Sequence, residues 1–423
     1  MGIRGMRLHS CIIVMALVIQ AGLAQGNGDT EIAWTTVGPA ESVVLRAIVT
    51  AENCPTITIG KTHVSMQNRS GPVLPAFPNR VCETILKQGI SDAHLFGVPV
   101  PGWDGRPDRI VVLGDTGCRV KKNLVQACDD PEAWPFQAIA SSAAAWQPDL
   151  VIHVGDYFYR DTRCPKSNPS CLDSPWGDNW QVAWQDFFRP ASPLLQVAPW
   201  VMVRGNHESC NRTGKAWFRF LDPRAFVQAC RDQTQGYTVS LGSENLYVLD
   251  TTIADDIFPV APTVEYFAKQ LKSFADEKGR DAWLLSHKPI WAFGSAGDGR
   301  EEPVLFRTNP TLQAAANLYF PDTIKTVLSG HLHQIQFLRF ADVGPGQITV
   351  GNGGALLNPP LQTNVRGLVI AGRKIKASRT DSTFGFLTLE RQEEKWLVTA
   401  RSVGGTPLHS FLTGFNLVAG LEN

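Results

Sequence analysis

Ile110-Val111-Val112-Leu113-Gly114-Asp115-Thr116-Gly117 (residues 110–117) decides the fold, because a short apolar run is followed by glycine and then by an acidic side chain. Runs of four or five aliphatic residues bounded by glycine are typical of strands buried on both faces. In four later segments a short apolar run is likewise followed by polar side chains of the metal-ligand type, at Gly155-Asp156, Gly205-Asn206-His207-Glu208, Ser286-His287 and Gly330-His331-Leu332-His333. Ligands gather at the carboxyl ends of the strands in an α/β sheet. We therefore expect these polar residues to converge on one edge of one sheet.

The chain from Arg109 onward has the pattern of an α/β protein. Residues 132–146 are rich in alanine, and residues 263–278 are amphipathic with Gly279 after them, so both stretches predict helices. Strands that alternate with helices predict a mostly parallel, layered sheet. Phe384–Glu390 and Lys395–Arg401 predict an antiparallel hairpin that closes this sheet.

The segment before Arg109 contains none of these motifs. Thr56–Ile59 and Thr62–Met66 alternate in the manner of strands. A chain of this length exceeds one core and suggests a large domain with a small one. We therefore expect a signal peptide (residues 1–24), a small β-sandwich-like domain with its linker (residues 25–107) and a large domain that carries the motifs (residues 108–423).

The first 24 residues are typical of a secretory signal peptide. Arg4 and Arg7 precede the apolar stretch Ile12–Ile19, and the small-residue segment Ala21–Ala24 follows it. The apolar stretch is shorter than the roughly 20 residues that span a bilayer, and no later segment has that length. We expect cleavage after Ala24, no stable membrane span, and a secreted or periplasmic protein. An uncleaved anchor is the alternative.

Cysteine usage agrees with export. Cleavage removes one of nine cysteines, Cys11, and the even number that remains suggests disulfide bonds. None forms a C-x-x-C pair, so thiolate zinc sites and thioredoxin chemistry are not expected. Eight cysteines allow 105 arrangements, so the sequence alone does not fix the connectivity. Our hypothesis is that neighbours pair and close four loops: Cys54 with Cys82, Cys118 with Cys128, Cys164 with Cys171, and Cys210 with Cys230.

The charge balance excludes one class of partner. The chain has 39 basic and 39 acidic residues, so its net charge is zero. A neutral protein has no electrostatic driving force toward nucleic acid or an anionic membrane. We expect no nucleic-acid partner, while the oligomeric state stays open.

The side chains at the strand ends form the inventory of a two-metal site. Carboxylate, imidazole and amide oxygen ligands suit iron, manganese and zinc, and do not suit copper(I). Two ions about 3.5–4 Å apart need one carboxylate that touches both, and together they activate a nucleophile for phosphoryl transfer. A serine hydrolase is excluded because the chain has no G-x-S-x-G elbow.

The motifs resemble those of the calcineurin-like metallophosphoesterases and, among them, the purple acid phosphatases. Many members of the superfamily carry histidine two residues after the first aspartate, where this chain has Gly117. The chain instead has Tyr159 three residues after the second aspartate, which is the purple acid phosphatase variant. The resemblance implies a layered β-sandwich flanked by helices, preceded by a small all-β domain, with residues 108–423 as the metallophosphoesterase catalytic domain.

The resemblance also implies the ligands. One metal ion would be held by Asp115, Asp156, Tyr159 and His333. The other would be held by Asp156, Asn206, His287 and His331, with Asp156 as the bridge. A phenolate and two carboxylates favour Fe(III), whereas imidazoles and an amide favour a divalent ion such as Fe(II), Zn(II) or Mn(II). His207 would stand near the leaving oxygen as the general acid or as a charge stabiliser.

The function expected from this site is hydrolysis of small phosphate monoesters by a metal-bound hydroxide, as in an acid phosphatase. A phosphodiesterase or nucleotide hydrolase on the same site is the main alternative. A binding protein that has lost turnover would lack ligands, and every ligand is present. One departure concerns the loop Trp291–Glu302, which lacks the histidines that touch the substrate in the plant enzymes and offers Ser295, Asp298 and Arg300 instead.

Overall fold

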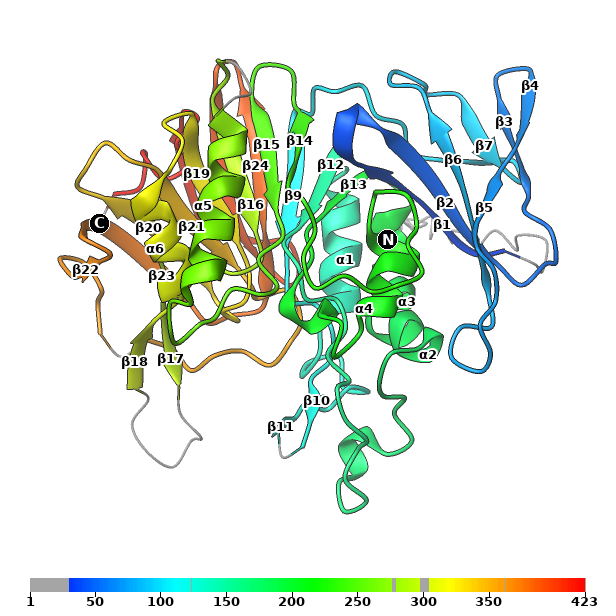
Figure 1. The fold of residues 1–423 in the computed structure, drawn as a ribbon, viewed down its shortest axis with the longest axis horizontal. Coiled ribbons are helices and arrows are strands. Elements are labelled where there is room, and N and C mark those ends of the chain that lie inside the picture. Colours follow the sequence, from blue (N-terminus) through cyan, green and yellow to red (C-terminus); the bar gives the residue numbers. More distant parts are fainter. Residues whose placement is uncertain (1–29, 123, 276–278, 297–303, 362, 423) are drawn as a thin grey trace, which may run out of the picture.

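The described chain forms four layers, in which two β-sheets lie face to face and helices cover their outer surfaces (Figure 1). The structure is a computed structural model that describes residues 30–122, 124–275, 279–296, 304–361 and 363–422. The signal peptide predicted for residues 1–24 lies outside the described residues. The expected class, an α/β sandwich flanked by helices and preceded by all-β segments, is confirmed.

The first sheet carries three of the five motif strands at its centre. Across its described residues the order is β26 (Pro407–Thr413), β25 (Lys395–Ser402), β24 (Gly385–Gln392), β9 (Arg109–Leu113), β12 (Leu150–His153), β13 (Trp200–Met202), β1 (Thr30–Val37), β2 (Val43–Val49), β6 (Arg80–Leu86) and β5 (Gln67–Ser70). Strands β9, β12, β13 and β1 are parallel. The predicted hairpin is β24–β25, and β24 pairs antiparallel with β9.

The second sheet carries the other two motif strands. Its order is β14 (Tyr237–Ser240), β15 (Asn245–Leu249), β16 (Ala282–Ser286), β19 (Ile324–Ser329), β21 (Gly346–Val350), β20 (Ile335–Phe340), β23 (Arg373–Asp381) and β22 (Val369–Ile370). The expectation that all five motifs lie on one sheet is therefore wrong. The apolar runs predict strands, but they do not show which strands pair, because a strand buried on both faces fits either sheet of a sandwich.

The core explains why the motif strands are apolar throughout. Ile110 and Val112 of β9 pack between the two sheets, whereas Val111 and Leu113 pack under the helices on the other face. In β16, Trp283 packs between the sheets and contacts Trp396 of β25 with ring centroids 5.3 Å apart. Each strand thus buries both of its faces, as the sequence predicts.

Helices cover the two outer faces (Figure 1). Beside the first sheet lie α1 (Phe136–Ala145), α2 (Trp180–Ala183), α3 (Arg189–Leu195) and α4 (Gly214–Ala216), with π-helical turns at Trp184–Phe188 and Trp217–Leu221. Beside the second lie α5 (Ala261–Ala275) and α6 (Pro310–Leu318). The helices predicted at 132–146 and 263–278 correspond to α1 and α5, although residues 276–278 lie outside the described residues.

The amino-terminal strands are continuous with the motif sheet. Strand β1 pairs with β13 at Thr36 and Trp200, so β1, β2, β6 and β5 extend the first sheet. A separate sheet consists of β3 (Thr56–Ile59), β4 (Thr62–Ser65), β7 (Ala93–Leu95) and β8 (Val98–Pro99). The domain boundary after residue 107 stays a prediction.

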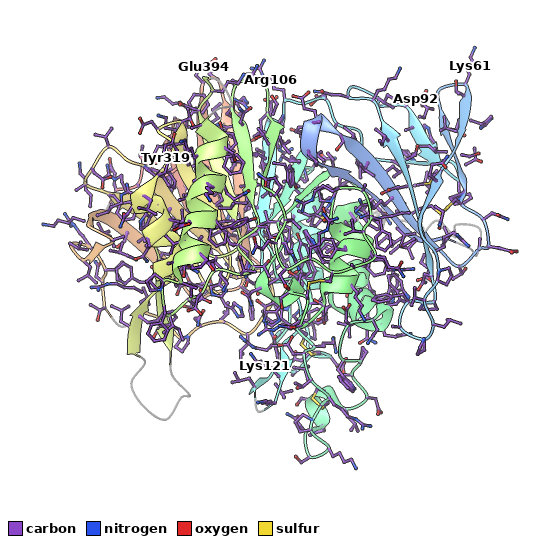
Figure 2. The ribbon with its side chains drawn as sticks, in the orientation of Figure 1. Lys61, Asp92, Arg106, Lys121, Tyr319 and Glu394 are labelled. Carbon is purple, nitrogen blue, oxygen red and sulfur yellow. A yellow bond between two sulfur atoms is a disulfide. The ribbon has the colours of Figure 1, made fainter. Side chains whose placement is uncertain are left out.

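Loops at one end of the molecule carry two small hairpins, β10 (Val120–Lys121) with β11 (Leu124–Val125), and β17 (Phe293–Ala296) with β18 (Val304–Arg307). Figure 2 shows Lys121 at this end and Glu394, in the β24–β25 turn, at the opposite end. The cysteines of the described chain pair as neighbours, which confirms the hypothesis: 54–82, 118–128, 164–171 and 210–230. None of the described helices has the length and apolar character needed to cross a membrane.

Candidate metal centre

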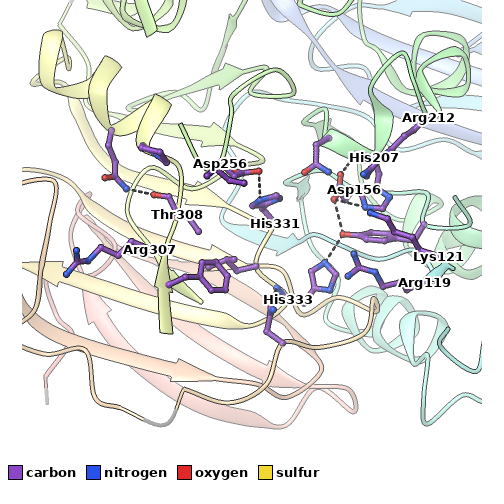
Figure 3. A pocket seen from close by; sticks show the side chains of 18 residues that line it. Arg119, Lys121, Asp156, His207, Arg212, Asp256, Arg307, Thr308, His331 and His333 are labelled. Carbon is purple, nitrogen blue, oxygen red and sulfur yellow. Dashed lines mark hydrogen bonds and ion pairs between the residues drawn. The ribbon is translucent and has the colours of Figure 1, made fainter. Parts of the chain in front are cut away.

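The polar residues that follow the five strands meet at one pocket of about 870 Å³ (Figure 3). Its lining includes Asp156, Tyr159, Asn206, His207, His331 and His333. Asp115 and His287 are fully buried and contact these residues directly. The structure therefore brings together every residue that the sequence predicts for the site, although they come from two sheets.

Three of these residues have an uncommon backbone conformation. Asp115, Asp156 and His331 have φ angles of 56°, 60° and 72°. Non-glycine residues seldom occupy this left-handed region, which costs of order 1 kcal/mol or more and is found at functional sites. The backbone turns sharply at these points so that the side chains face the pocket rather than continuing the strands.

Tyr159 lies at the centre of one group of side chains. Its hydroxyl oxygen is 2.7 Å from Asp115 Oδ1, 2.9 Å from Asp156 Oδ2 and 2.9 Å from His333 Nε2. Burial and then the charges of the two aspartates raise the pKa of Tyr159. The neighbouring Tyr157 points elsewhere, because its hydroxyl donates to the carbonyl of His153 at 3.3 Å.

Asp156 also belongs to a second group, with Asn206, His287 and His331. Ligand atoms of Asp156, His287 and His331 all lie within 4.8 Å of one another. His287 Nε2 is 3.1 Å from Asp156 Oδ2 and 3.2 Å from Asn206 Oδ1. Asp156 therefore links the two groups, which is the position that a bridging carboxylate needs.

The second nitrogen of two imidazoles is fixed by backbone carbonyls. Nδ1 of His287 is 2.9 Å from the carbonyl oxygen of Val154, and Nδ1 of His333 is 2.5 Å from that of Leu356. A carbonyl only accepts, so Nδ1 of each ring carries the proton and Nε2 of the neutral ring is an acceptor. This arrangement of outer partners is typical of histidines that bind metals.

The donor set therefore fits metal cations. Nε2 of His287 and the carboxylate of Asp156 are both acceptors, and one hydroxyl proton of Tyr159 serves three acceptors. Such a cluster requires either extra protons or cations between its atoms. In the metal-free protein a proton takes this place: although burial opposes it, the charge of Asp156 raises the pKa of His287 to about 9.

Gly117 leaves the space that Tyr159 requires. A Cβ atom at position 117 would lie 2.6 Å from the carbonyl oxygen of Tyr157 and 2.9 Å from the amide nitrogen of Tyr159. Real Cβ atoms do not approach a backbone so closely. A histidine at position 117 and a tyrosine loop packed against it are therefore incompatible, which gives a physical reason for the pairing of Gly117 with Tyr159.

A buried glutamate joins the loops that carry Asp156 and Asn206. Glu208 accepts hydrogen bonds from the backbone nitrogens of Gly205 at 3.0 Å, Asp156 at 3.1 Å and Tyr157 at 2.8 Å. Burial and then the charge of Asp156 raise the pKa of Glu208 to about 8. Glu208 thus supports the site without facing the pocket.

A buried aspartate likewise supports the backbone at Tyr159. Asp186, from the π-helical turn after α2, accepts from the backbone nitrogen of Tyr159 at 2.8 Å and from Arg160 Nε at 2.6 Å. None of the sequence motifs marks Asp186. Its signal is a lone acid within Trp180–Leu195, a stretch otherwise apolar enough to be buried.

His207, the expected general acid, lies beside Tyr159 with ring centroids 3.9 Å apart. Its Nδ1 is 3.2 Å from both the carbonyl oxygen of Phe158 and Asp161 Oδ1, and its Nε2 is 4.0 Å from Asp156 Oδ2. Burial alone would raise the pKa of Asp161, but its hydrogen bond with His207 lowers it on balance. Asp161 was also missed, although it follows Tyr159 by two residues.

Asp256 contacts the site from the second sheet's loops. Its Oδ2 is 3.3 Å from His331 Nε2 and 2.8 Å from Lys288 Nζ. Burial opposes ionisation, but the hydrogen bond with His331 holds the pKa of Asp256 well below its usual range. No sequence motif marks Asp256, which lies in a loop rather than at a strand end.

The basic residues close to the motifs differ in their surroundings. Arg119 and Lys121 line the pocket, whereas Lys122 is exposed and does not. Arg204 is buried and paired with Asp250 at 3.2 Å. In the loop Trp291–Glu302, Ser295 is buried, and Asp298 and Arg300 lie outside the described residues.

The chain is similar to known phosphoesterases. The calcineurin-like phosphoesterase family matches residues 108–335, which is more than half of the chain. Purple acid phosphatase 15 of Arabidopsis thaliana is 24% identical over 292 residues, covering 64% of this chain and 50% of that protein. The chain spans about half the length of the curated relatives it matches.

Solved structures show the same fold. The purple acid phosphatase PPD1 from yellow lupin (Lupinus luteus) seeds superposes with a TM-score of 0.58 at 16% identity, covering 91% of this chain and 74% of that one. The structure of PhoD superposes with a TM-score of 0.50 at 10% identity, covering 90% and 88%. The chain belongs to the calcineurin-like phosphoesterase family, and the predicted resemblance to purple acid phosphatases is confirmed.

Proposed function

We propose that the chain is a dinuclear-metal phosphoesterase of the acid phosphatase type, which hydrolyses phosphate monoesters. The observation that carries the proposal is the cluster of buried acceptor atoms around Asp156, which contacts both Tyr159 and His287. Membership of the calcineurin-like phosphoesterase family supports the same chemistry.

Two groups of residues would hold the ions. Asp115, Asp156, Tyr159 and His333 form the more negative group, and Asp156, Asn206, His287 and His331 form the more neutral one. The first suits Fe(III), because a strongly charged ion is needed to deprotonate a tyrosine whose pKa is raised by burial. The second suits Fe(II), Zn(II) or Mn(II). When bound, such ions supply Lewis acidity that acidifies water and neutralises phosphoryl charge.

His207 would donate a proton to the leaving group. Its Nδ1 is directed to the carbonyl oxygen of Phe158 and to Asp161, both at 3.2 Å, so Nε2 is the nitrogen that faces the pocket. A proton held at Nε2 can pass to the departing oxygen. Asp161 Oδ1, 3.2 Å from Nδ1, helps to hold the ring in this orientation.

Export is part of the proposal. The four disulfide bonds are consistent with an oxidising compartment. Together with the signal peptide predicted for residues 1–24, they support a secreted or periplasmic enzyme. Mass spectrometry of the exported protein tests this, since cleavage after Ala24 predicts an amino terminus at Gln25.

A phosphodiesterase or nucleotide hydrolase is the second candidate. The size of the pocket, about 870 Å³, favours this candidate, because it leaves room for a second substituent on the phosphate beside Phe306 and Arg307. Pockets of this size hold whole drug-sized ligands.

The experiment is a comparison of 4-nitrophenyl phosphate with bis(4-nitrophenyl) phosphate, using mature protein loaded with iron plus zinc or manganese. The Asp156→Ala protein sets the blank. We expect faster cleavage of the monoester at acid pH. A preference for the diester would favour the second candidate, and no turnover above the blank with both metals bound would contradict both.

A further inference from the structure

Three cations gather on one side of the pocket. Arg119 and Lys121 belong to the β10 hairpin, and Arg212 belongs to the loop that follows His207. Figure 3 shows the three side chains grouped beside His207 and Asp156. Disulfide 118–128 closes the first loop and disulfide 210–230 closes the second, so covalent bonds limit how far either can move. We refer to Arg119, Lys121 and Arg212 as the cationic cluster.

The cluster carries more positive charge than its protein neighbours neutralise. In the part of the chain that the structure describes, Asp161 is the one carboxylate that acts on Lys121 and Arg212, and it also lies 3.2 Å from His207. The pKa of Lys121 is lowered by burial and then by the positive charge of Arg212. Three like charges that share a single carboxylate destabilise a protein, so their arrangement calls for a further anion from a ligand.

Two hydrogen-bond donors of the cluster are also unused. Arg119 Nε and Arg212 Nη1 are buried and have no hydrogen-bond partner among the described residues. A buried N–H of a charged group without an acceptor is costly. Phosphate oxygens are the acceptors that guanidinium groups match best, because one anion takes several N–H groups.

The cluster lies on the leaving-group side of the site. Arg119 is 5.6 Å from the ring centre of Tyr159, and that ring lies against His207 with the two ring planes tilted by 34°. His207 is the residue to which the proposed function assigns the leaving oxygen. The pocket is also too large for one phosphate group alone, so the part of the substrate beyond the leaving oxygen would extend toward the cluster.

We propose that Arg119, Lys121 and Arg212 form an anion subsite for a second phosphate group, carried by the leaving group of the substrate. The enzyme then favours phosphoanhydrides and bisphosphorylated compounds over simple monoesters. Hydrolysis releases inorganic phosphate and a leaving group that keeps its own phosphate. This inference rests on the proposed phosphoesterase function and deepens it by naming the class of substrate.

The test measures kcat/KM for pyrophosphate and for fructose 1,6-bisphosphate, each divided by kcat/KM for 4-nitrophenyl phosphate. The variants are Lys121→Gln and, as the matched control, Lys122→Gln, which removes the same charge from the adjacent exposed residue. We expect the wild-type ratios to exceed one and Lys121→Gln to lower them roughly tenfold, which corresponds to one charge-assisted hydrogen bond. Lys122→Gln should leave them unchanged, and Lys121→Arg should restore most of the preference.

The outcomes separate this inference from the proposed function. Equal ratios in Lys121→Gln and Lys122→Gln proteins of equal thermal stability would overturn the subsite while leaving the phosphatase in place. Failure to hydrolyse any of the three substrates would overturn the proposed function itself. A response with pyrophosphate alone assigns the subsite to phosphoanhydrides, and a response with both substrates extends it to spaced phosphates.

Discussion

The floor and the rim of the pocket are built in different ways. The floor consists of Asp115, Asp156, Tyr159 and His287, none more than 2% exposed, and all their buried polar atoms have partners. The rim consists of the cationic cluster, which lies on the β10–β11 hairpin and on the loop after His207 and retains unused donors. A buried, fully partnered group has one position, whereas a partly solvated group keeps the freedom to meet a ligand.

Because of this difference, we expect the floor to determine metal binding and catalysis and the rim to determine which substrates are preferred. The floor residues follow strands of the two sheets, so they move only if the core moves. The rim residues are held in two disulfide-closed segments outside the two large sheets. Changes in the floor should therefore alter metal binding and every activity together, while changes in the rim should alter the ratio between substrates.

The largest effect is expected for Asp156→Ala, because Asp156 contacts both groups of the floor. We expect loss of both metals and a fall in kcat/KM of about 10³-fold or more, equivalent to about 4 kcal/mol. Metal content by mass spectrometry and hydrolysis of 4-nitrophenyl phosphate measure the two effects. Asp129→Ala, at an exposed position, is the control. Retained turnover in Asp156→Ala would show that the site lies elsewhere.

A smaller effect is expected for Asp186→Asn, which leaves Arg160 buried without its charged partner. Breaking a buried pair costs about 3 kcal/mol of unfolding free energy. Because Asp186 also accepts from the backbone of Tyr159, metal affinity should fall about 10-fold to 100-fold. Chemical denaturation and metal titration measure these quantities.

Glu244→Gln is the matched control for Asp186→Asn. Glu244 is also fully buried and paired with an arginine, Arg391, at 2.9 Å, but it precedes strand β15 and so lies at the end of the sheet away from the motifs. The Glu244→Gln substitution should reduce the stability of the fold without changing the metal affinity. Equal metal affinities in the two variants would show that Asp186 stabilises the fold but does not position Tyr159.

The same contrast explains what could be predicted from sequence. The floor follows buried strands, so apolar runs with a polar residue after them revealed Asp115, Asp156 and His287 in advance. The distribution of these strands over two sheets was missed, since local patterns carry no information on pairing. Asp256 and Arg212 were missed because loop residues reach the pocket through tertiary packing, which leaves no periodic signal.

Tyr159→Phe should change the spectrum more than the rate. The variant keeps Asp115, Asp156 and His333 but removes the phenolic oxygen, so any visible band from phenolate bound to Fe(III) should vanish, with only about a tenfold or smaller loss of activity. Tyr157→Phe is the control, because its hydroxyl bonds to the carbonyl of His153 instead. A band that persists in Tyr159→Phe would assign the colour to another ligand or exclude iron.

The smallest effect is expected from salt, which acts on the rim and spares the floor. Raising the ionic strength from about 0.1 to about 1 M shortens the Debye length from about 10 to about 3 Å, so partly exposed charges are screened while buried ones are not. The preference for pyrophosphate over 4-nitrophenyl phosphate should fall about threefold, with metal content unchanged. In the Lys121→Gln protein the same change should have less effect, since one of the screened charges is already absent. If salt lowered both activities equally, the cationic cluster would not distinguish the two substrates. The claim that the rim sets the choice of substrate while the floor holds the metals would then be wrong.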